Sequence, residues 1–234
     1  MRVRVAAGLT LASFVALGSL LSAQDADRVI PGGGVFVPGW TGKIDAGSAR
    51  QGRVLNDAKF VKEGDALHVT TGPATTFWNP ANTATGDYTV QATFREPRFM
   101  ELNSHPHSYG LFIGGTGMGT DQMSLVYCVA YGSGQALIRG FSGPSVFTLL
   151  PQSMNAAVHK APAVGQPVTQ QITWTVKGAR AECSINGTAV AGYDRAQIVT
   201  PGKLQSTDGV FGVRFTHNVE AVITGFTLNG RAVK

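Results

Sequence analysis

The chain of 234 residues contains 30 glycines and only 14% charged residues, so it resembles neither a disordered tail nor a helical bundle. Its formal net charge of +5 comes without a run of Lys and Arg, which argues against a nucleic-acid partner. This length is typical of one large all-β domain with many turns and little helix.

The N-terminus has the three parts of a secretory signal peptide at 1–23. Two arginines precede an apolar run at 5–21, and small residues end at Ala23 before the chain turns polar. Polar and small residues dilute the run, which disfavours a membrane anchor, so we expect cleavage after Ala23 and a secreted or periplasmic protein with no membrane contact. Residues 24–34 are predicted to be a flexible lead-in to a single domain at 35–234.

The segment 171–192 predicts its own strand register. If Gly178-Ala179 is a two-residue turn, every facing pair on one side of the hairpin is apolar. Those pairs are Ile172 with Ile185, Trp174 with Cys183 and Val176 with Ala181. A slip of one residue would exchange the apolar and polar faces, so the register is strongly specified. A second turn at Asn186-Gly187 places Val190 beside Cys183, and one buried face is typical of half a β-sandwich.

Alternation of apolar and polar residues predicts strands along the rest of the chain. The clearest pattern is DYTVQATFR at 87–95. Further strands are predicted at 35–37, 66–71, 75–78, 107–115, 122–131, 134–141, 209–216 and 219–228. We expect the strand at 75–78 to stop at Asn79-Pro80, and a single helical turn at 155–161. About a dozen short strands separated by turns indicate a sandwich or barrel.

Cys128 and Cys183 are the only cysteines, and both lie on predicted strands. Export would place them in an oxidising compartment, where disulfides form. Whether they bond depends on the distance and orientation of the two side chains, which the sequence does not give. A disulfide between Cys128 and Cys183 and two buried thiols are therefore both open.

Several motifs follow one another in a characteristic order. They are Gly39-Trp40, DYTVQATF, SYGLFIGG, the W-x-V…INGT meander and GVFGVRF…ITGFTLNG. This order resembles the concanavalin A-like lectin/glucanase jelly roll, and most of all the secreted 3-keto-disaccharide hydrolase-like (laminin-G-like) bacterial domains. The resemblance implies a two-sheet antiparallel β-sandwich and a carbohydrate ligand.

The acidic motifs of those relatives are missing. An E-x-Q type strand motif is replaced by Tyr127-Cys128-Val129, and the E-x-D-x-x-E of the glucanases does not occur. Retaining glycoside cleavage needs two carboxylates about 5 Å apart, and no pair of that kind is visible. The sequence therefore favours a carbohydrate-binding module without a cofactor. A hydrolase with an atypical site and a structural or adhesion domain remain as alternatives.

Strand parity predicts a ligand-binding surface on the outer side of one sheet. If Cys128 faces the core, then Tyr127 and Tyr131 point outward, and the same parity turns Arg139 and Arg214 outward. Tyrosine rings offer an apolar face to a pyranose, and arginine offers a fixed fork of donors. The alternative is that the tyrosines are ordinary cross-strand aromatics and the arginines are surface charges.

Two further candidates lie outside these strands. Trp78 could stack a sugar at a loop tip or simply close one end of the core. His105 and His107 form an alternative site, because imidazoles two residues apart on an extended chain point to one side. With His68 or His217 nearby they could hold zinc or copper. Since no third ligand lies at a recognisable spacing, a polar loop is the preferred interpretation and no metal is predicted.

Overall fold

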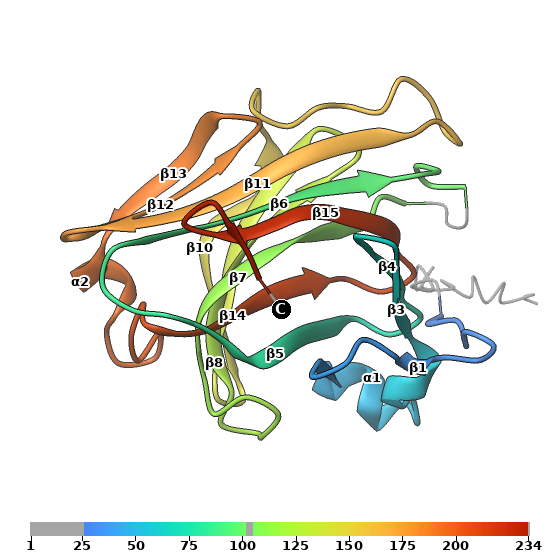
Figure 1. Ribbon diagram of the computed structural model, residues 1–234, viewed down its shortest axis with the longest axis horizontal. Helices are drawn as coiled ribbons and strands as arrows, with labels where there is room; N and C mark the ends of the chain where they lie inside the picture. Colours follow the sequence, from blue (N-terminus) through green and yellow to red (C-terminus); the bar gives the residue numbers. More distant parts are fainter. Residues whose placement is uncertain (1–25, 102–104, 234) are drawn as a thin grey trace, which may run out of the picture.

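The computed structural model describes residues 26–101 and 105–233, which form a sandwich of two β-sheets (Figure 1). In spatial order, the nine-stranded sheet contains β1 (Gly34–Val35), β3 (Lys59–Glu63), β4 (Ala66–Thr70), β15 (Glu220–Leu228), β6 (Tyr88–Glu96), β11 (Val168–Lys177), β12 (Arg180–Ile185) and β13 (Thr188–Asp194), with β16 (Arg231–Ala232) beside β15. The seven-stranded sheet contains β10 (Ser145–Met154), β9 (Gln135–Ser142), β8 (Ser124–Tyr131), β7 (Ser108–Thr116), β14 (Gly209–Phe215), β5 (Thr75–Ala84) and β2 (Thr41–Ile44).

This architecture confirms the predicted all-β jelly roll. Neighbouring strands are antiparallel, apart from the short parallel pair of β1 with β3. The predicted signal peptide at 1–23 lies outside the described residues. Among the residues that are described, no helix is long and apolar enough to cross a membrane.

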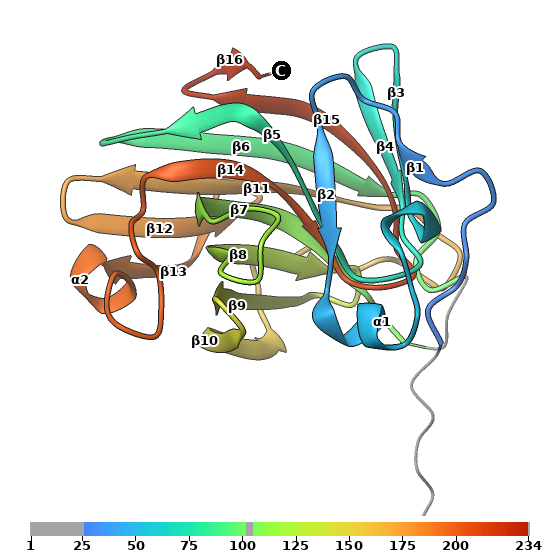
Figure 2. The same cartoon turned by 90° about the horizontal axis from the view of Figure 1, so that it is seen from below.

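Two short α-helices lie at opposite ends of the sandwich, α1 (Ala46–Arg50) and α2 (Arg195–Ile198) (Figure 1). Figure 2 shows β2 leading directly into α1. A single 3-10 turn, η1 (Leu55–Asp57), follows α1. The other described residues between strands form turns and loops, as the high glycine content predicted.

The core lies between the two sheets. The alternation of β6, β11 and β12 places one apolar row of each strand in this layer, and Trp174 is completely buried there. Its indole Nε1 donates a hydrogen bond to the Leu111 carbonyl of the opposite sheet at 3.3 Å. Cys128 of β8 and Cys183 of β12 form a disulfide across the layer, with their Cα atoms 6.5 Å apart. The disulfide alternative is thereby confirmed.

The predicted hairpin register between β11 and β12 is confirmed at every pair. The second hairpin is wrong by one residue. Cys183 faces Ala191, because a β-bulge between β12 and β13 leaves Val190 as an extra residue. A bulge inserts one residue on one strand and shifts all later pairs, and nothing in the apolar pattern marks its position.

The end of the strand predicted at 75–78 is also wrong. Strand β5 continues to Ala84, with an irregularity that separates the pair Trp78–Gly212 from the pair Thr83–Val210. Pro80 lies within this irregular part, where no ladder hydrogen bond has to come from its nitrogen. The Asn79 side chain accepts a hydrogen bond from the Ala81 N–H at 2.9 Å and so stabilises the local bend.

Two other expectations differ from the structure. The segment 155–161 contains a non-helical turn in place of the predicted helical turn. The Asn155 side chain accepts a hydrogen bond from the Ala157 N–H at 2.9 Å, and this bond competes with helical hydrogen bonding. Strands β2, β3, β10 and β16 were not predicted. Strand β10 is a largely exposed edge strand that contains Pro151, and an edge tolerates both features.

Candidate functional site

The outer face of the seven-stranded sheet carries the residues predicted to bind a ligand. Along β8, Cys128 belongs to the core between the sheets, whereas Tyr127 and Tyr131 belong to a second apolar cluster on the other side. The members of this outer cluster are Trp78, Phe112, Met123, Leu125, Tyr127, Val129, Tyr131 and Leu137. Tyr127 is only 5% exposed and Tyr131 only 6% exposed. The predicted parity is correct, but these rings are covered and do not offer an open stacking face.

Arg214 of β14 lies within this outer cluster. Its guanidinium carbon is 5.4 Å from the ring centroid of Tyr127 and 5.3 Å from that of Phe141, which is within cation–π range. Its two terminal nitrogens donate to the two carboxylate oxygens of Asp45, at 2.7 and 2.5 Å. This is a bidentate pair, so the terminal N–H donors of Arg214 form their hydrogen bonds within the protein.

The electrostatics of this cluster keep the arginine charged and the tyrosines neutral. Arg214 is 3% exposed, and its burial alone would lower its pKa, but the Asp45 carboxylate and Tyr127 more than offset that effect and raise it. Burial raises the pKa of Tyr127 and of Tyr131, although the charge of Arg214 lowers both in part. Arg214 therefore stays charged across the physiological pH range.

A pocket of about 460 Å³ opens beside the Arg214–Asp45 pair. Its walls are the end of β2 with α1 at 43–50, the loop at 120–123 and the β9–β10 hairpin at 141–146. Asp45 and Phe141 line the pocket and also contact Arg214. The pocket therefore lies directly against the cluster that the strand parity identified.

Charged side chains of both signs line this pocket together with apolar ones. Lys43 bridges two of its walls, since its Nζ is 3.0 Å from the Asp121 carboxylate and donates to the Thr120 carbonyl. Arg50 is exposed at the end of α1, and Phe141 supplies an aromatic ring. Of these residues, the sequence interpretation identified none. The Asp45–Arg214 contact spans 169 positions, so no local pattern could have predicted it.

The other predicted residues lie on the same face. Arg139 pairs in register with Tyr127, and its Nε donates to the Thr148 hydroxyl at 3.2 Å. Trp78 is buried, and Gly119 packs so closely that a Cβ there would be 3.5 Å from the indole. The structure thus brings the five predicted residues to one sheet face, with Trp78 as part of its apolar layer.

The alternative site lies at one end of the strands. His105 and His107 meet His217 just beyond β14, whereas His68 lies on β4 with its Nε2 3.5 Å from Glu63. The sequence interpretation named His217 as a possible third member without a spacing to support it. The contact forms because β7 and β14 are neighbours in the sheet.

A second pocket, of about 520 Å³, lies by the nine-stranded sheet. Trp40, Phe226, Lys62 and Asp65 are among its lining residues. Trp40 and Phe226 are largely buried, so little of either ring is exposed in this pocket. This pocket is the alternative to the Asp45 pocket as a place where a ligand could bind the sandwich.

No family model matches this sequence, and no curated protein sequence is similar to it. Solved structures match it by fold. A protein of unknown function with a galectin-like fold from Bacillus subtilis superposes with a TM-score of 0.56 at 12% identity, over 83% of this chain and 90% of the other. The chain has a concanavalin A-like jelly-roll fold.

Two other solved structures match less well. The carbohydrate-binding module CBM66 from Bacillus subtilis matches with a TM-score of 0.46 at 8% identity, over 84% of this chain and 99% of that one. An endo-β-1,3-glucanase from Pyrococcus furiosus matches with a TM-score of 0.48 at 11% identity, over 79% and 85%. The match to the galectin-like protein, at 12% identity, establishes only the fold. The finer resemblance to 3-keto-disaccharide hydrolase-like domains remains a prediction.

Proposed function

We propose that the protein is a carbohydrate-binding module whose ligand occupies the pocket between α1, the loop at 120–123 and the β9–β10 hairpin. The observation that carries this proposal is the content of that one pocket, where the Phe141 ring lies among the charged side chains of Lys43, Arg50 and Asp121. A pyranose has an apolar face and a rim of hydroxyls. Aromatic rings and fixed donors and acceptors are the groups that recognise it.

The walls of the pocket are held in place before any ligand arrives. The bidentate Asp45–Arg214 pair fixes the start of α1 on the sheet, and Lys43 of β2 contacts the loop through the Asp121 carboxylate and the Thr120 carbonyl. A preformed site pays less conformational entropy on binding than a mobile one. Rigid walls therefore favour recognition of a small saccharide or the end of a glycan.

Binding is proposed in preference to hydrolysis because of the carboxylates. Among the described residues that line the pocket, the carboxylates are Asp45 and Asp121, and each is already ion-paired with a basic side chain. Glycoside cleavage requires one carboxyl group to donate a proton and a second to attack or to activate water. Neither role suits a carboxylate engaged in this way.

We further propose that the protein acts outside the cytoplasm. The leader predicted at 1–23 supports export, and the disulfide between Cys128 and Cys183 suits an oxidising compartment. The ligand would then be a glycan met in the periplasm or the extracellular medium.

A glycan array with the full-length chain tests the proposal, followed by calorimetry with the best glycan. We expect Arg50→Ala to weaken binding about tenfold, which corresponds to about 1.4 kcal/mol, through the loss of hydrogen-bond donors. Phe141→Leu should also weaken binding because it removes the ring. Arg231→Ala, an exposed arginine on β16, is the matched control and should bind normally. Absence of any glycan ligand, or affinity that survives both pocket variants, would refute the proposal.

A further inference from the structure

Three histidines from two distant parts of the sequence meet at the end of the β7–β14 pair. The ring centroids of His105 and His107 are 4.3 Å apart, those of His107 and His217 are 4.4 Å apart, and those of His105 and His217 are 5.6 Å apart. One nitrogen from each ring lies within 4.8 Å of the others. Three imidazole nitrogens thus converge on one small volume.

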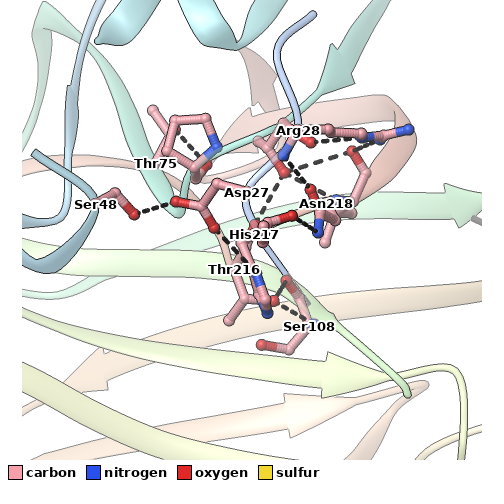
Figure 3. A network of polar contacts seen from close by, with 12 residues as sticks. Asp27, Arg28, Ser48, Thr75, Ser108, Thr216, His217 and Asn218 are labelled. Carbon is pink, nitrogen blue, oxygen red and sulfur yellow. Dashed lines mark hydrogen bonds and ion pairs between the residues drawn. The ribbon is translucent and has the colours of Figure 1, made fainter. Parts of the chain in front are cut away.

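The backbone fixes two of these histidines beside each other. The Ser108 N–H donates to the Thr216 hydroxyl at 2.8 Å, and the Thr216 N–H donates to the Ser108 carbonyl at 2.9 Å (Figure 3). His107 directly precedes Ser108, and His217 directly follows Thr216. The last hydrogen bonds between the two strands therefore determine the separation of the two rings.

Asp27 orients the imidazole ring of His217. Its Oδ1 lies 3.1 Å from His217 Nδ1, and its Oδ2 accepts a 2.5 Å hydrogen bond from the Ser48 hydroxyl of α1 (Figure 3). Asp27 falls in the segment predicted as a lead-in, yet it is buried here. A carboxylate on one imidazole nitrogen orients the ring and leaves Nε2 to face a ligand, and metal-binding histidines commonly have this arrangement.

The turn that carries His217 is anchored as well. The Asn218 side chain accepts a hydrogen bond from the Arg28 N–H at 3.0 Å, and the Asn218 N–H donates to the Gly72 carbonyl at 2.9 Å (Figure 3). The segment that supplies Asp27 and the turn that supplies His217 are thus joined side by side. The His217–Asp27 contact belongs to a fixed network.

We propose that His105, His107 and His217 form a binding site for a single zinc ion, with Asp27 as the positioning carboxylate of His217. Tetrahedral zinc bound by imidazole needs nitrogens ~3.4 Å apart, and small rotations of the side chains close the observed spread to that value. His107 is buried, while His105 and His217 are partly exposed, so the site opens to solvent on one side. Three protein ligands with an open fourth position are typical of a zinc site that can exchange a water or a small anion.

The donor set selects the class of metal. Three neutral imidazoles suit zinc and the neighbouring late transition metals, whereas calcium and magnesium require oxygen ligands. Calcium is therefore a negative control for the same protein. Copper is a competing ion of the same donor class, and it would occupy the same three nitrogens.

The zinc site and the pocket share α1. Asp45 of the β2–α1 junction binds Arg214, and Ser48 of α1 binds Asp27, which contacts His217. Arg214 and His217 are three positions apart at the end of β14. The metal proposal does not rest on carbohydrate binding, because it uses a separate set of side chains.

Equilibrium dialysis of the metal-free full-length chain against zinc tests the proposal, with a preparation that carries no polyhistidine tag. We expect one zinc ion per chain, removable by EDTA, and no binding of calcium. His105→Ala should weaken zinc binding by about 100-fold, and Asp27→Asn by about 10-fold or more. His68→Ala is the matched control, because His68 lies on β4 outside the cluster, and it should bind zinc as the wild type does.

A second measurement needs no variant. X-ray absorption of the zinc-loaded wild type should show nitrogen or oxygen neighbours at about 2.0 Å with the outer-shell scattering of three imidazoles. Absence of zinc binding, equal affinity in wild type and His105→Ala, or a coordination shell without imidazole would each overturn the proposal. If His105→Ala fails to fold, the absorption spectrum alone decides the question.

Discussion

The side chain of Glu96 shows how the strand pattern can bury a charged group. Glu96 ends β6 on the row that faces the core, and it is 7% exposed. Its burial raises the pKa of the carboxyl group from 4.5 to about 7, although the Met100 backbone and the neighbouring Tyr109 side chain lower it in part. The protonated form is therefore favoured in the folded protein over a range where the unfolded chain is ionised.

This shift predicts a dependence of stability on pH. Because the folded pKa exceeds the unfolded pKa, the contribution of Glu96 is fully present below pH 4.5 and is lost as pH rises through 7. The free energy of unfolding should fall by about 3 kcal/mol between pH 4.5 and 8 from this group. Urea denaturation of wild type and Glu96→Gln over this range measures it. Glu63→Gln, at an exposed position, is the control, and an identical pH slope in wild type and Glu96→Gln would contradict the assignment.

The Arg214–Asp45 pair gives a second prediction for single side chains. Asp45→Asn leaves a buried guanidinium without its carboxylate and should lower the free energy of unfolding by about 3 kcal/mol. The double variant Asp45→Asn/Arg214→Met removes the unpaired charge and should be more stable than Asp45→Asn alone. Chemical denaturation of both proteins checks this. A double variant that is less stable than the single one would show that the arginine contributes mainly by packing.

At this scale the sequence predicts which face a residue occupies but not what covers it. Strand parity placed Tyr127, Tyr131 and Arg214 on one side of the sheet correctly. Asp45, which pairs with the buried Arg214, and Gly119, which packs on Trp78, come from chain segments far from these strands. Such contacts arise from the packing of whole elements, so they carry no local signal.

At the scale of strands, the disulfide connects the two sheets. The sequence allowed this bond but could not distinguish it from two buried thiols. It joins β8 to β12 and closes a loop of 55 residues. In the chain-entropy model, such a loop stabilises the folded state by about 4 kcal/mol at most. The variant Cys128→Ala/Cys183→Ala should therefore melt well below the wild type under non-reducing conditions. Equal melting temperatures would show that the bridge contributes nothing.

Other strands were predictable only where the alternation is regular. The β11–β12 register follows from three apolar pairs, whereas the bulge at Val190 and the irregularity after Trp78 break the period of two. Strand β10 pairs along one edge and exposes most of its side chains, so its composition does not distinguish it from a loop. Regular half-buried strands can be predicted from the sequence, whereas edge strands and bulges cannot.

For the whole molecule, the predicted leader at 1–23 leads us to expect export from the cytoplasm. The exported protein should begin at Gln24, because Ala23 is the last small residue before the chain turns polar. Intact-mass measurement of the secreted protein settles this. A mass that includes residues 1–23 would indicate a retained anchor and would move the proposed function to a membrane surface.

Also at this scale, α1 connects the two proposed sites. Asp45 and Ser48 hold it against Arg214 and Asp27, so the pocket wall and the histidine cluster share one short helix. This helix was not predicted, because a segment of five residues is too short to show a helical periodicity. Its position depends on contacts with residues that lie more than twenty positions away in both directions.

Amide chemical-shift mapping during titration with the best glycan from the array tests the central claim most directly. Carbohydrate binding in the proposed pocket predicts that the perturbed amides cluster at 43–50, 120–123 and 141–146, the three segments that form its walls. Perturbations centred on Trp40, Lys62 and Phe226 would place the ligand at the pocket of the nine-stranded sheet and contradict the account.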